Sequence, residues 1–514
     1  MLSSLSKNDL YRGLVRVLWF FLIISLPITS LPLIARFTGS LVAPLSAIPL
    51  AVLLLVWLIP FLIERGKFPI EILPFLYFVL IALVITSLSF FLGGYYSRGR
   101  DFFDQSFRAF ITVGIGLAFY LLFSVYPQTE GRIRQTLLFI NIMGVILIPL
   151  TMFEVLLLRK YTVVQNFPGW VLSIRNALAV QSPNTDFTTR VFGFAYEPSW
   201  FVRLFDLILF PVWLAAVFQR KSLLKWRLWV FQIEDLLMVL GLVVFAFSSP
   251  RIGLLAFLAS LAFLTIQLLS RLVQRCTTWY ITRRKRPLKN TLWVKILIGV
   301  ILTVILLGLA AGALVGYITI ASSWDNRFQL MLREPIREQL DIFPLSTERI
   351  IYFARDLAFF ERVIFWISGL DIFNDFPFGV GLGNAGFYFL DHMHGAGFES
   401  YELRYLAYRA NYLANTKNMW TRLLAETGFI GFAAFLVWLY IQWRSAGVMR
   451  KSKSEVLQIL GLAGQLFLLA YLFESFSMDS FAMPYQWVMM GLIAAGGLLA
   501  RKEQKAKDRP AQLA

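Results

Sequence analysis

The sequence predicts an all-α polytopic membrane protein with one large, mostly helical loop outside the membrane. Three observations lead to this fold class. Of the 514 residues, 58% are hydrophobic and 15% are charged, and the mean hydropathy is +0.69, which excludes a soluble globular protein. Most of the chain divides into apolar blocks that are long enough to cross a bilayer. The stretch 322–422 is the one long segment that cannot do so.

Because roughly twenty apolar residues cross the hydrocarbon layer, the sequence predicts about twelve membrane spans. Basic residues gather in alternate connections, so the positive-inside rule predicts that both termini are cytosolic. This topology also accounts for the net charge of +18 without nucleic acid as a partner. We place the approximate span centres at Ile24, Leu53, Leu80, Gly116, Val145, Leu209, Gly241, Leu258, Leu306, Ala434, Gln465 and Leu492.

The predicted organisation has three parts. Residues 1–321 contain the first nine spans, residues 322–422 form an outer cap, and residues 423–514 contain the last three spans and a basic cytosolic tail. The cap is rich in Phe, Tyr, Trp and Leu, so we expect it to be folded and not disordered. The chain has a single cysteine, Cys276, which excludes an intramolecular disulfide, so packing must hold the cap together.

The outer connections contain the polar residues that could carry chemistry. Arg251 lies between two apolar blocks, where its guanidinium either contacts lipid headgroups or binds a diphosphate through its forked donors. Arg190 lies upstream of Glu197 and Pro198. Since proline suits the first turn of a helix, Glu197 is either the N-cap of that helix or a carboxylate that orients a hydroxyl and acts as a base.

Two patterns in the cap predict helices at the membrane surface. The stretch 350–373 is almost continuously apolar, and Arg355 and Arg362 are seven residues apart, so we expect them on one face of an amphipathic helix. These arginines contact either headgroups or substrate. An aromatic stripe at helical spacing suits either an interfacial belt or a platform for sugars, and it consists of Tyr401, Tyr405, Tyr408 and Tyr412.

A glycine-rich motif and two histidines complete the cap. Residues 381–386 fit G-x-G-x-x-G, but no βαβ unit surrounds them, so we expect a close turn and not a nucleotide site. His392 and His394 lie beside Asp391. With no further His or Cys nearby they give little support for a metal, and we expect neither a metal nor a cofactor. Either histidine could act as a general base.

Three patches resemble the O-antigen ligase and Wzy-type polysaccharide polymerase superfamily. The first is Phe376–Asn384, and the second is Lys417–Gly431. The third is the turn Ser249-Pro250-Arg251, with Arg190 to Gly193 and Glu197-Pro198-Ser199 upstream. The order of these patches and the layout of many spans with one large, late outer loop are also similar to the superfamily.

The resemblance implies a GT-C-like, inverting, metal-independent glycosyltransferase of the bacterial inner membrane, with its large loop in the periplasm. The implied substrate is an undecaprenyl-diphosphate-linked oligosaccharide, and the implied partners are membrane lipids and a chain-length regulator and flippase of the same pathway. We place the catalytic candidates at Arg190, Glu197, Arg251, His392 and His394. Residues that would bind the diphosphate or the glycan are Arg355, Arg362, Tyr401, Tyr405, Lys417, Asn418 and Arg422.

One departure from the superfamily pattern favours a polymerase. In the ligases a histidine typically precedes the asparagine of the second patch, but here Lys417 occupies that position. We therefore expect an O-antigen or exopolysaccharide polymerase, which transfers a growing glycan from polyprenyl diphosphate onto a lipid-linked repeat unit. A ligase that delivers glycan to another acceptor is the alternative. A flippase fits less well, because a rocking transporter needs two comparable halves.

Overall fold

The computed structural model describes residues 9–38, 41–65, 68–93, 95–182, 189–224, 227–248, 251–283, 292–323, 346–356 and 359–511. Helices dominate these ranges, and the strands within them form two short antiparallel hairpins, β1–β2 and β3–β4. The predicted all-α polytopic class is confirmed. Ser249 and Pro250 of the predicted turn lie outside the described residues.

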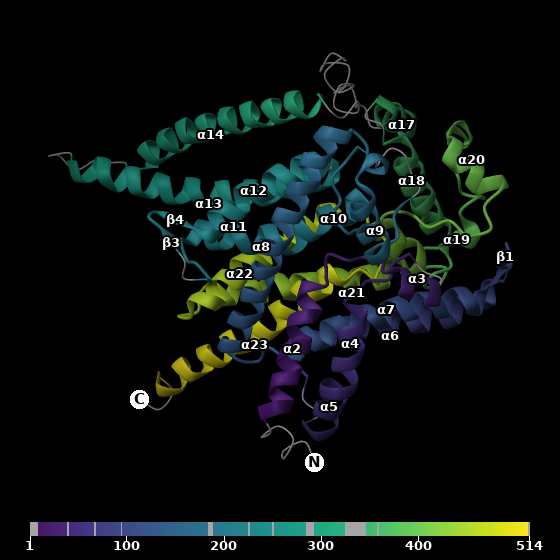
Figure 1. Ribbon diagram of the computed structural model, residues 1–514, viewed down its shortest axis with the longest axis horizontal. Coiled ribbons are helices and arrows are strands. Elements are labelled where there is room, and N and C mark those ends of the chain that lie inside the picture. The colour runs from purple at the N-terminus through teal and green to yellow at the C-terminus, as the bar shows by residue number, and fades with distance from the viewer. Residues whose placement is uncertain are drawn as a thin grey trace.

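The first half of the chain supplies helices α2 to α12, several of which pack against helices of the second half (Figure 1). Its helices and strands are α2 (Asp9–Ile24), α3 (Pro32–Thr38), α4 (Ala47–Leu53), η1 (Leu54–Leu58), α5 (Ile59–Arg65), η2 (Ile70–Ile72), α6 (Leu73–Ser89), η3 (Phe90–Leu92), β1 (Tyr96–Ser97), β2 (Arg100–Asp101), α7 (Phe102–Val125), α8 (Glu130–Tyr161), η4 (Val164–Asn166), α9 (Gly169–Leu178), α10 (Pro198–Leu204), η6 (Phe205–Leu209), α11 (Phe210–Gln219), β3 (Arg227–Leu228), β4 (Phe231–Gln232) and α12 (Ile233–Ser248).

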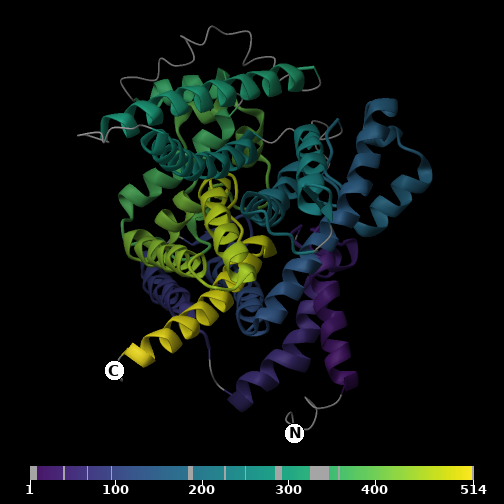
Figure 2. The same cartoon turned by 90° about the vertical axis from the view of Figure 1, so that its left-hand side faces the viewer.

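The second half completes the bundle and adds the cap. Helix α13 packs against α14 and α22, α21 packs against α6 and α22, and α23 packs against α7. In Figure 2 the start of α2 (purple) and the end of α23 (yellow) both lie at the lower side of the molecule. The elements are α13 (Arg251–Arg283), α14 (Leu292–Ala321), α17 (Thr347–Asp356), α18 (Phe360–Asp375), α19 (Ala385–Tyr388), η7 (Gly395–Glu399), α20 (Tyr401–Tyr408), α21 (Met419–Met449), α22 (Glu455–Glu474) and α23 (Pro484–Ala511).

All of the predicted span centres lie in helical segments. Among the described residues, nine segments are long and apolar enough to cross a membrane. The other predicted centres lie in α2, α12 and α23, which are not among those nine. The nine are Ala47–Glu64, Ile70–Leu92, Phe102–Val125, Glu130–Tyr161, Pro198–Gln219, Arg251–Tyr280, Leu292–Ala321, Met419–Met449 and Glu455–Glu474.

Helices α17 to α20 gather at one end of the molecule, and the β3–β4 hairpin lies at the opposite end (Figure 1). The single amphipathic helix predicted over 350–373 is wrong, because α17 ends at Asp356 and α18 begins at Phe360. The backbone of Phe359 is not helical (φ −111°, ψ 3°), and its ring turns toward Arg251. As a result, Arg355 and Arg362 belong to two different helices and do not share a face.

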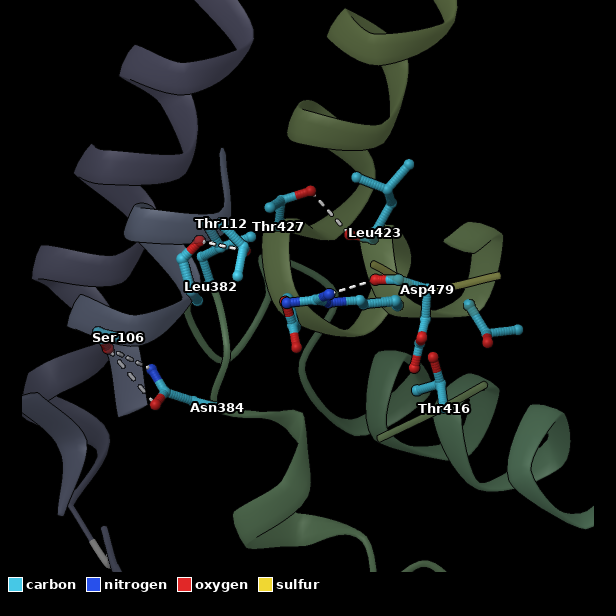
Figure 3. Close-up of polar contacts among 12 residues, drawn as sticks. Ser106, Thr112, Leu382, Asn384, Thr416, Leu423, Thr427 and Asp479 are labelled. Atoms are coloured by element: carbon cyan, nitrogen blue, oxygen red, sulfur yellow. Dashed lines mark hydrogen bonds and ion pairs between the residues drawn. The ribbon is translucent and has the colours of Figure 1, made fainter. Parts of the chain in front are cut away.

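The glycine-rich turn 381–386 docks the cap onto α6 and α7, as Figure 3 shows. The backbone N–H of Leu382 donates to Thr86 Oγ1 in α6 at 2.9 Å. The side-chain amide of Asn384 donates to Ser106 Oγ in α7 at 3.1 Å. Both bonds are buried, so the cap is attached to the bundle by specific polar contacts as well as by apolar packing. The predicted close approach of this turn to a neighbouring segment is confirmed.

We predict that Gly381→Ala lowers the stability of the protein by roughly 1–3 kcal/mol, as strained backbone positions commonly cost. Gly381 has φ +89°, and a Cβ there would lie 2.3 Å from Ser89 Oγ. Thermal unfolding of the purified protein in detergent measures the change. The matched control is Gly395→Ala, because a Cβ on Gly395 in η7 would meet nothing within 4 Å. Equal melting temperatures for the two variants would contradict the docking role of the turn.

Candidate active site

A polar cavity of about 120 Å³ lies between the bundle and the cap. Three arginines and one glutamate chosen from the sequence meet there, although they come from distant parts of the chain: Arg190, Glu197, Arg251 and Arg362. The remaining lining residues are Pro198, Ser199, Val202, Ser248, Ile252, Gly253, Phe359, Glu474 and Ser477.

The loop between α9 and α10 carries Arg190 to the cavity. The backbone N–H of Val191 donates to the carbonyl of Phe247 at 3.3 Å, and the Ser248 hydroxyl donates to the carbonyl of Val191 at 2.8 Å. Both bonds join the loop to the last turn of α12. Because Arg251 begins α13 only three positions after Ser248, these bonds also hold Arg190 and Arg251 in the same neighbourhood.

Glu197 occupies the N-cap position of α10, and Pro198 is the first residue of that helix, as the sequence predicted. However, the Glu197 side chain makes no capping hydrogen bond. Its Oε1 accepts a hydrogen bond from the Ser199 hydroxyl, and the side chain lines the cavity. Glu197 therefore occupies the predicted N-cap position without capping the helix through its side chain, and its carboxylate is left beside the cavity.

Arg251 and Arg362 reach the cavity from opposite sides, one from the bundle and one from the cap. The Arg251 guanidinium lies 4.2 Å from the centre of the Phe359 ring, a cation–π contact that joins α13 to the start of α18. Arg362 Nη1 donates to the carbonyl of Ser477 at 3.5 Å. Burial lowers the pKa of Arg362, and repulsion from Arg203 lowers it further. Its guanidinium still stays charged at neutral pH, because arginine titrates far above that range.

A buried ion pair beneath the cavity was missed by the sequence analysis. Arg203 Nε lies 3.2 Å from Glu474 Oε2, and both side chains are almost fully buried. Arg203 also donates to the carbonyl of Ser477, which Arg362 contacts too. Asp206, which is 2% exposed, faces Glu474. The signal was present in the sequence, since ionisable residues within an apolar span are costly and usually have a function.

Charged side chains of both signs line the cavity. Arg190, Arg251 and Arg362 line it together with the carboxylates of Glu197 and Glu474. Of these two carboxylates, Glu474 is paired with Arg203 below the cavity. Arginine side chains that line one cavity have the donor geometry that suits an anion such as a diphosphate.

The structure does not bring the two histidines to this cavity. His392 Nε2 lies 3.0 Å from Asp375 Oδ2 and His392 Nδ1 lies 2.8 Å from the carbonyl of Tyr388, so the ring links α18 to the turn after α19. His394 Nδ1 accepts from the N–H of Ala396 at the start of η7. Within the part of the chain that the structure describes, no three His, Cys, Asp or Glu side chains gather into a possible metal site.

The exposed cap residues chosen from the sequence also lie outside the cavity lining. Arg355 forms an ion pair with Glu399 at 2.5 Å on the outer side of the cap. The rings of Tyr401 and Tyr405 stack in α20 with their centres 6.5 Å apart, and both side chains are exposed. Helix α20 ends at Tyr408, so the predicted helical stripe holds for Tyr401, Tyr405 and Tyr408 but does not extend to Tyr412. None of these tyrosines lines the cavity with the three arginines.

Residues of the second sequence patch do not line the cavity but contact the segments that surround it. Asn418 caps α21, because its Oδ1 accepts from the N–H groups of Trp420 and Thr421. Arg422 pairs with Glu426 at 2.9 Å and donates to the carbonyl of Asp479. It therefore anchors the segment after α22 that carries Ser477. Lys417, in contrast, pairs with Glu402 and lies over the Phe365 ring.

We predict that Arg203→Ala destabilises the protein by about 3–5 kcal/mol, the usual cost of leaving one buried charge without its partner. The double variant Arg203→Ala/Glu474→Ala should lose much less than the sum of the single variants, which thermal unfolding in detergent measures as a coupling. The control pair is Asp9 and Arg12, which are exposed and 4.0 Å apart and should show no coupling. Strict additivity at Arg203 and Glu474 would contradict a buried ion pair.

Part of the chain matches a known protein family. Residues 236–436 match the sequence model of the O-antigen ligase family. No curated protein sequence matches the chain. The matched stretch contains Arg251 and Arg362, which line the cavity, and both the glycine-rich turn and the first part of α21. From residue 236 to residue 436, the chain thus has the pattern of the O-antigen ligase family, which confirms the resemblance predicted from the sequence.

Proposed function

We propose that the chain is a glycosyltransferase that moves a glycan from a polyprenyl diphosphate to an acceptor hydroxyl at the outer face of the bacterial inner membrane. One observation carries this proposal. Arg190, Arg251 and Arg362, from three distant segments, meet the carboxylate of Glu197 in a single cavity. The family match supports a role in the assembly of lipid-linked glycans.

The proposed reaction is a single displacement that inverts the anomeric carbon. The acceptor oxygen attacks this carbon while the bond from the carbon to the diphosphate oxygen breaks. The departing diphosphate gains negative charge. The three guanidinium groups stabilise this charge, and they are in position before the reaction begins. Glu197 accepts the proton of the acceptor hydroxyl, and the Ser199 hydroxyl holds one of its carboxylate oxygens in place. No metal is assigned a role in these steps.

The topology that we propose places the cap, residues 322–422, in the periplasm and both termini in the cytosol. The position of α17 to α20 at the end opposite the β3–β4 hairpin supports this, because the hairpin lies in one of the basic connections (Figure 1). The acceptor and the lipid diphosphate would then enter from the outer leaflet, beside the cap.

Polymerase and ligase differ only in the acceptor, and we propose the polymerase. Lys417 supports this choice, because it replaces the histidine expected in a ligase and is paired with Glu402. A ligase is the second candidate, because the matching family is described as O-antigen ligase.

We predict that Arg251→Ala and Arg190→Ala each reduce transfer by about a hundredfold to a thousandfold, the usual effect of removing one stabiliser of developing charge. Arg251→Lys should recover only part of the activity, because lysine lacks the forked donors. Glu197→Gln keeps the shape of the side chain but cannot accept a proton, and it should be similarly impaired. Glycan gels and mass spectrometry of the products measure each rate.

The control for these variants is Arg409→Ala. Arg409 is an exposed arginine of the same cap that does not line the cavity, so its removal should leave the transfer rate unchanged. Full activity in both Arg251→Ala and Arg251→Lys would contradict the diphosphate site. Equal loss in Arg409→Ala would point to general damage instead.

We predict a ladder of products when the purified protein is given only its lipid-linked repeat unit, in the presence of EDTA. Such a ladder, spaced by one repeat, establishes a metal-independent polymerase. Consumption of the repeat unit only after a second acceptor lipid is added establishes a ligase and excludes the polymerase. Loss of turnover with EDTA that added Mg²⁺ restores would contradict the metal-independent mechanism.

A further inference from the structure

An apolar groove of about 120 Å³ lies next to the polar cavity, and nothing in the proposed reaction uses it. It is formed where the last turns of α8 meet η4 and α9. Apart from Thr151, Glu154 and Arg175, its lining is hydrocarbon, aromatic rings and backbone. The side chains that define it are Leu150, Phe153, Leu157, Phe167, Trp170 and Ile174.

One short loop forms a wall of both the groove and the cavity. Arg190 and Glu197 line the polar cavity, whereas Gly193 and Phe194, between them in the sequence, line the groove. Each of these lining residues is three positions from its neighbour across the loop, and three residues of extended chain span at most roughly 10 Å, so the backbone walls of the two sites adjoin. A molecule with a charged head and an apolar tail can therefore contact both.

The shared loop is held firmly against α8. Glu154 accepts hydrogen bonds from the N–H groups of Gly193 at 2.8 Å and Phe192 at 3.4 Å. Arg175 of α9 pairs with Glu154 at 2.6 Å, and its guanidinium lies 4.3 Å from the centre of the Phe192 ring. Glu154 and Arg175 are both buried, so this ion pair fixes the wall between the two sites and the angle between α8 and α9.

The rim of the groove is aromatic and faces outward. The rings of Phe153 and Trp170 stack with their centres 6.2 Å apart, yet the residues are 42% and 60% exposed. Ile174 is 48% exposed beside them. Exposed apolar side chains near the end of a membrane-spanning helix face lipid chains, so the groove opens toward lipid.

We propose that this groove binds the isoprenoid chain of the lipid diphosphate, in the units nearest to the diphosphate. This inference rests on the proposed function, because the polar cavity supplies the site for the diphosphate. The groove is small, so the rest of the chain stays in the bilayer. The loop 189–197 then contacts both the diphosphate and the first isoprenoid units. These two contacts together favour a polyprenyl diphosphate over a free phosphate or an ordinary phospholipid.

The test compares the binding of inorganic diphosphate, geranyl diphosphate and farnesyl diphosphate to the full-length protein in nanodiscs by calorimetry. Burial of a few carbon atoms is enough for the farnesyl compound to bind about tenfold or more tightly than inorganic diphosphate. Ile174→Trp fills the groove and should remove this advantage without changing the affinity for inorganic diphosphate. Trp170→Ala removes one side of the rim and should reduce the advantage in the same direction.

The matched control is Ile146→Trp. Ile146 lies on α8, which contacts α9, the helix of Ile174, and is 45% exposed, close to the 48% of Ile174, but it does not line the groove. This variant should bind farnesyl diphosphate as the unmodified protein does. Equal affinity of the unmodified protein for all three diphosphates, or an undiminished farnesyl advantage in both groove variants, would overturn the proposal.

Two further outcomes keep this inference separate from the proposed function. If inorganic diphosphate binds and Arg251→Ala weakens it, but chain length has no effect, the polar site stands and the groove proposal fails. If no diphosphate binds, the proposed function fails, and the groove proposal fails with it. Competition by a straight-chain phospholipid as effective as that by farnesyl diphosphate would assign the groove to ordinary membrane lipid and overturn the isoprenoid site.

Discussion

The carbonyl oxygen of Ser477 is the point on which the site depends. Arg203, inside the bundle, and Arg362, in the cap, both donate to it. Arg203 is held in turn by Glu474, which lies in α22 just before the segment that carries Ser477. One buried ion pair thus fixes the end of α22, and that end positions a cap arginine over the cavity. Burying one of these charges without its partner would cost much folding free energy, so few other arrangements of Arg203 and Glu474 would be stable.

The attachment of the cap to the bundle explains why the sequence patches lie where they do. The glycine-rich turn approaches α6 and α7 so closely that side chains would not fit, and the Gly381 N–H also donates to the carbonyl of Glu426 at 3.0 Å. Arg422 then joins α21 to the segment after α22. These first two patches support the site and do not line its cavity, whereas the third patch supplies Arg190, Glu197 and Arg251 to the lining. Only part of the cavity lies within the matched stretch 236–436, because Arg190, Glu197 and Glu474 fall outside it.

Two of the polar residues singled out from the sequence, Glu197 and Arg251, lie in one cavity lining at positions that the chain itself limits. Arg251 begins α13, and Glu197 precedes the proline that begins α10, so apolar blocks on one side left little freedom to place them elsewhere. The predictions were less successful in the cap. Arg355 and Arg362 were expected on one helical face, but the chain breaks at Phe359, whose ring contacts Arg251 instead of continuing the helix. Periodicity cannot reveal a break that a distant residue stabilises.

The sequence by itself determined the membrane class, the helical segments and the cap as a distinct stretch, because each follows from the hydropathy of consecutive residues. It also contained the local signals for Glu197 at a helix start and for the close glycine turn. Only the tertiary structure decided which charges meet. Arg203 and Glu474 are 271 positions apart and lie in apolar spans, and the two histidines became structural contacts of the cap. Charges pair through space, and the packing of the helices sets their distances.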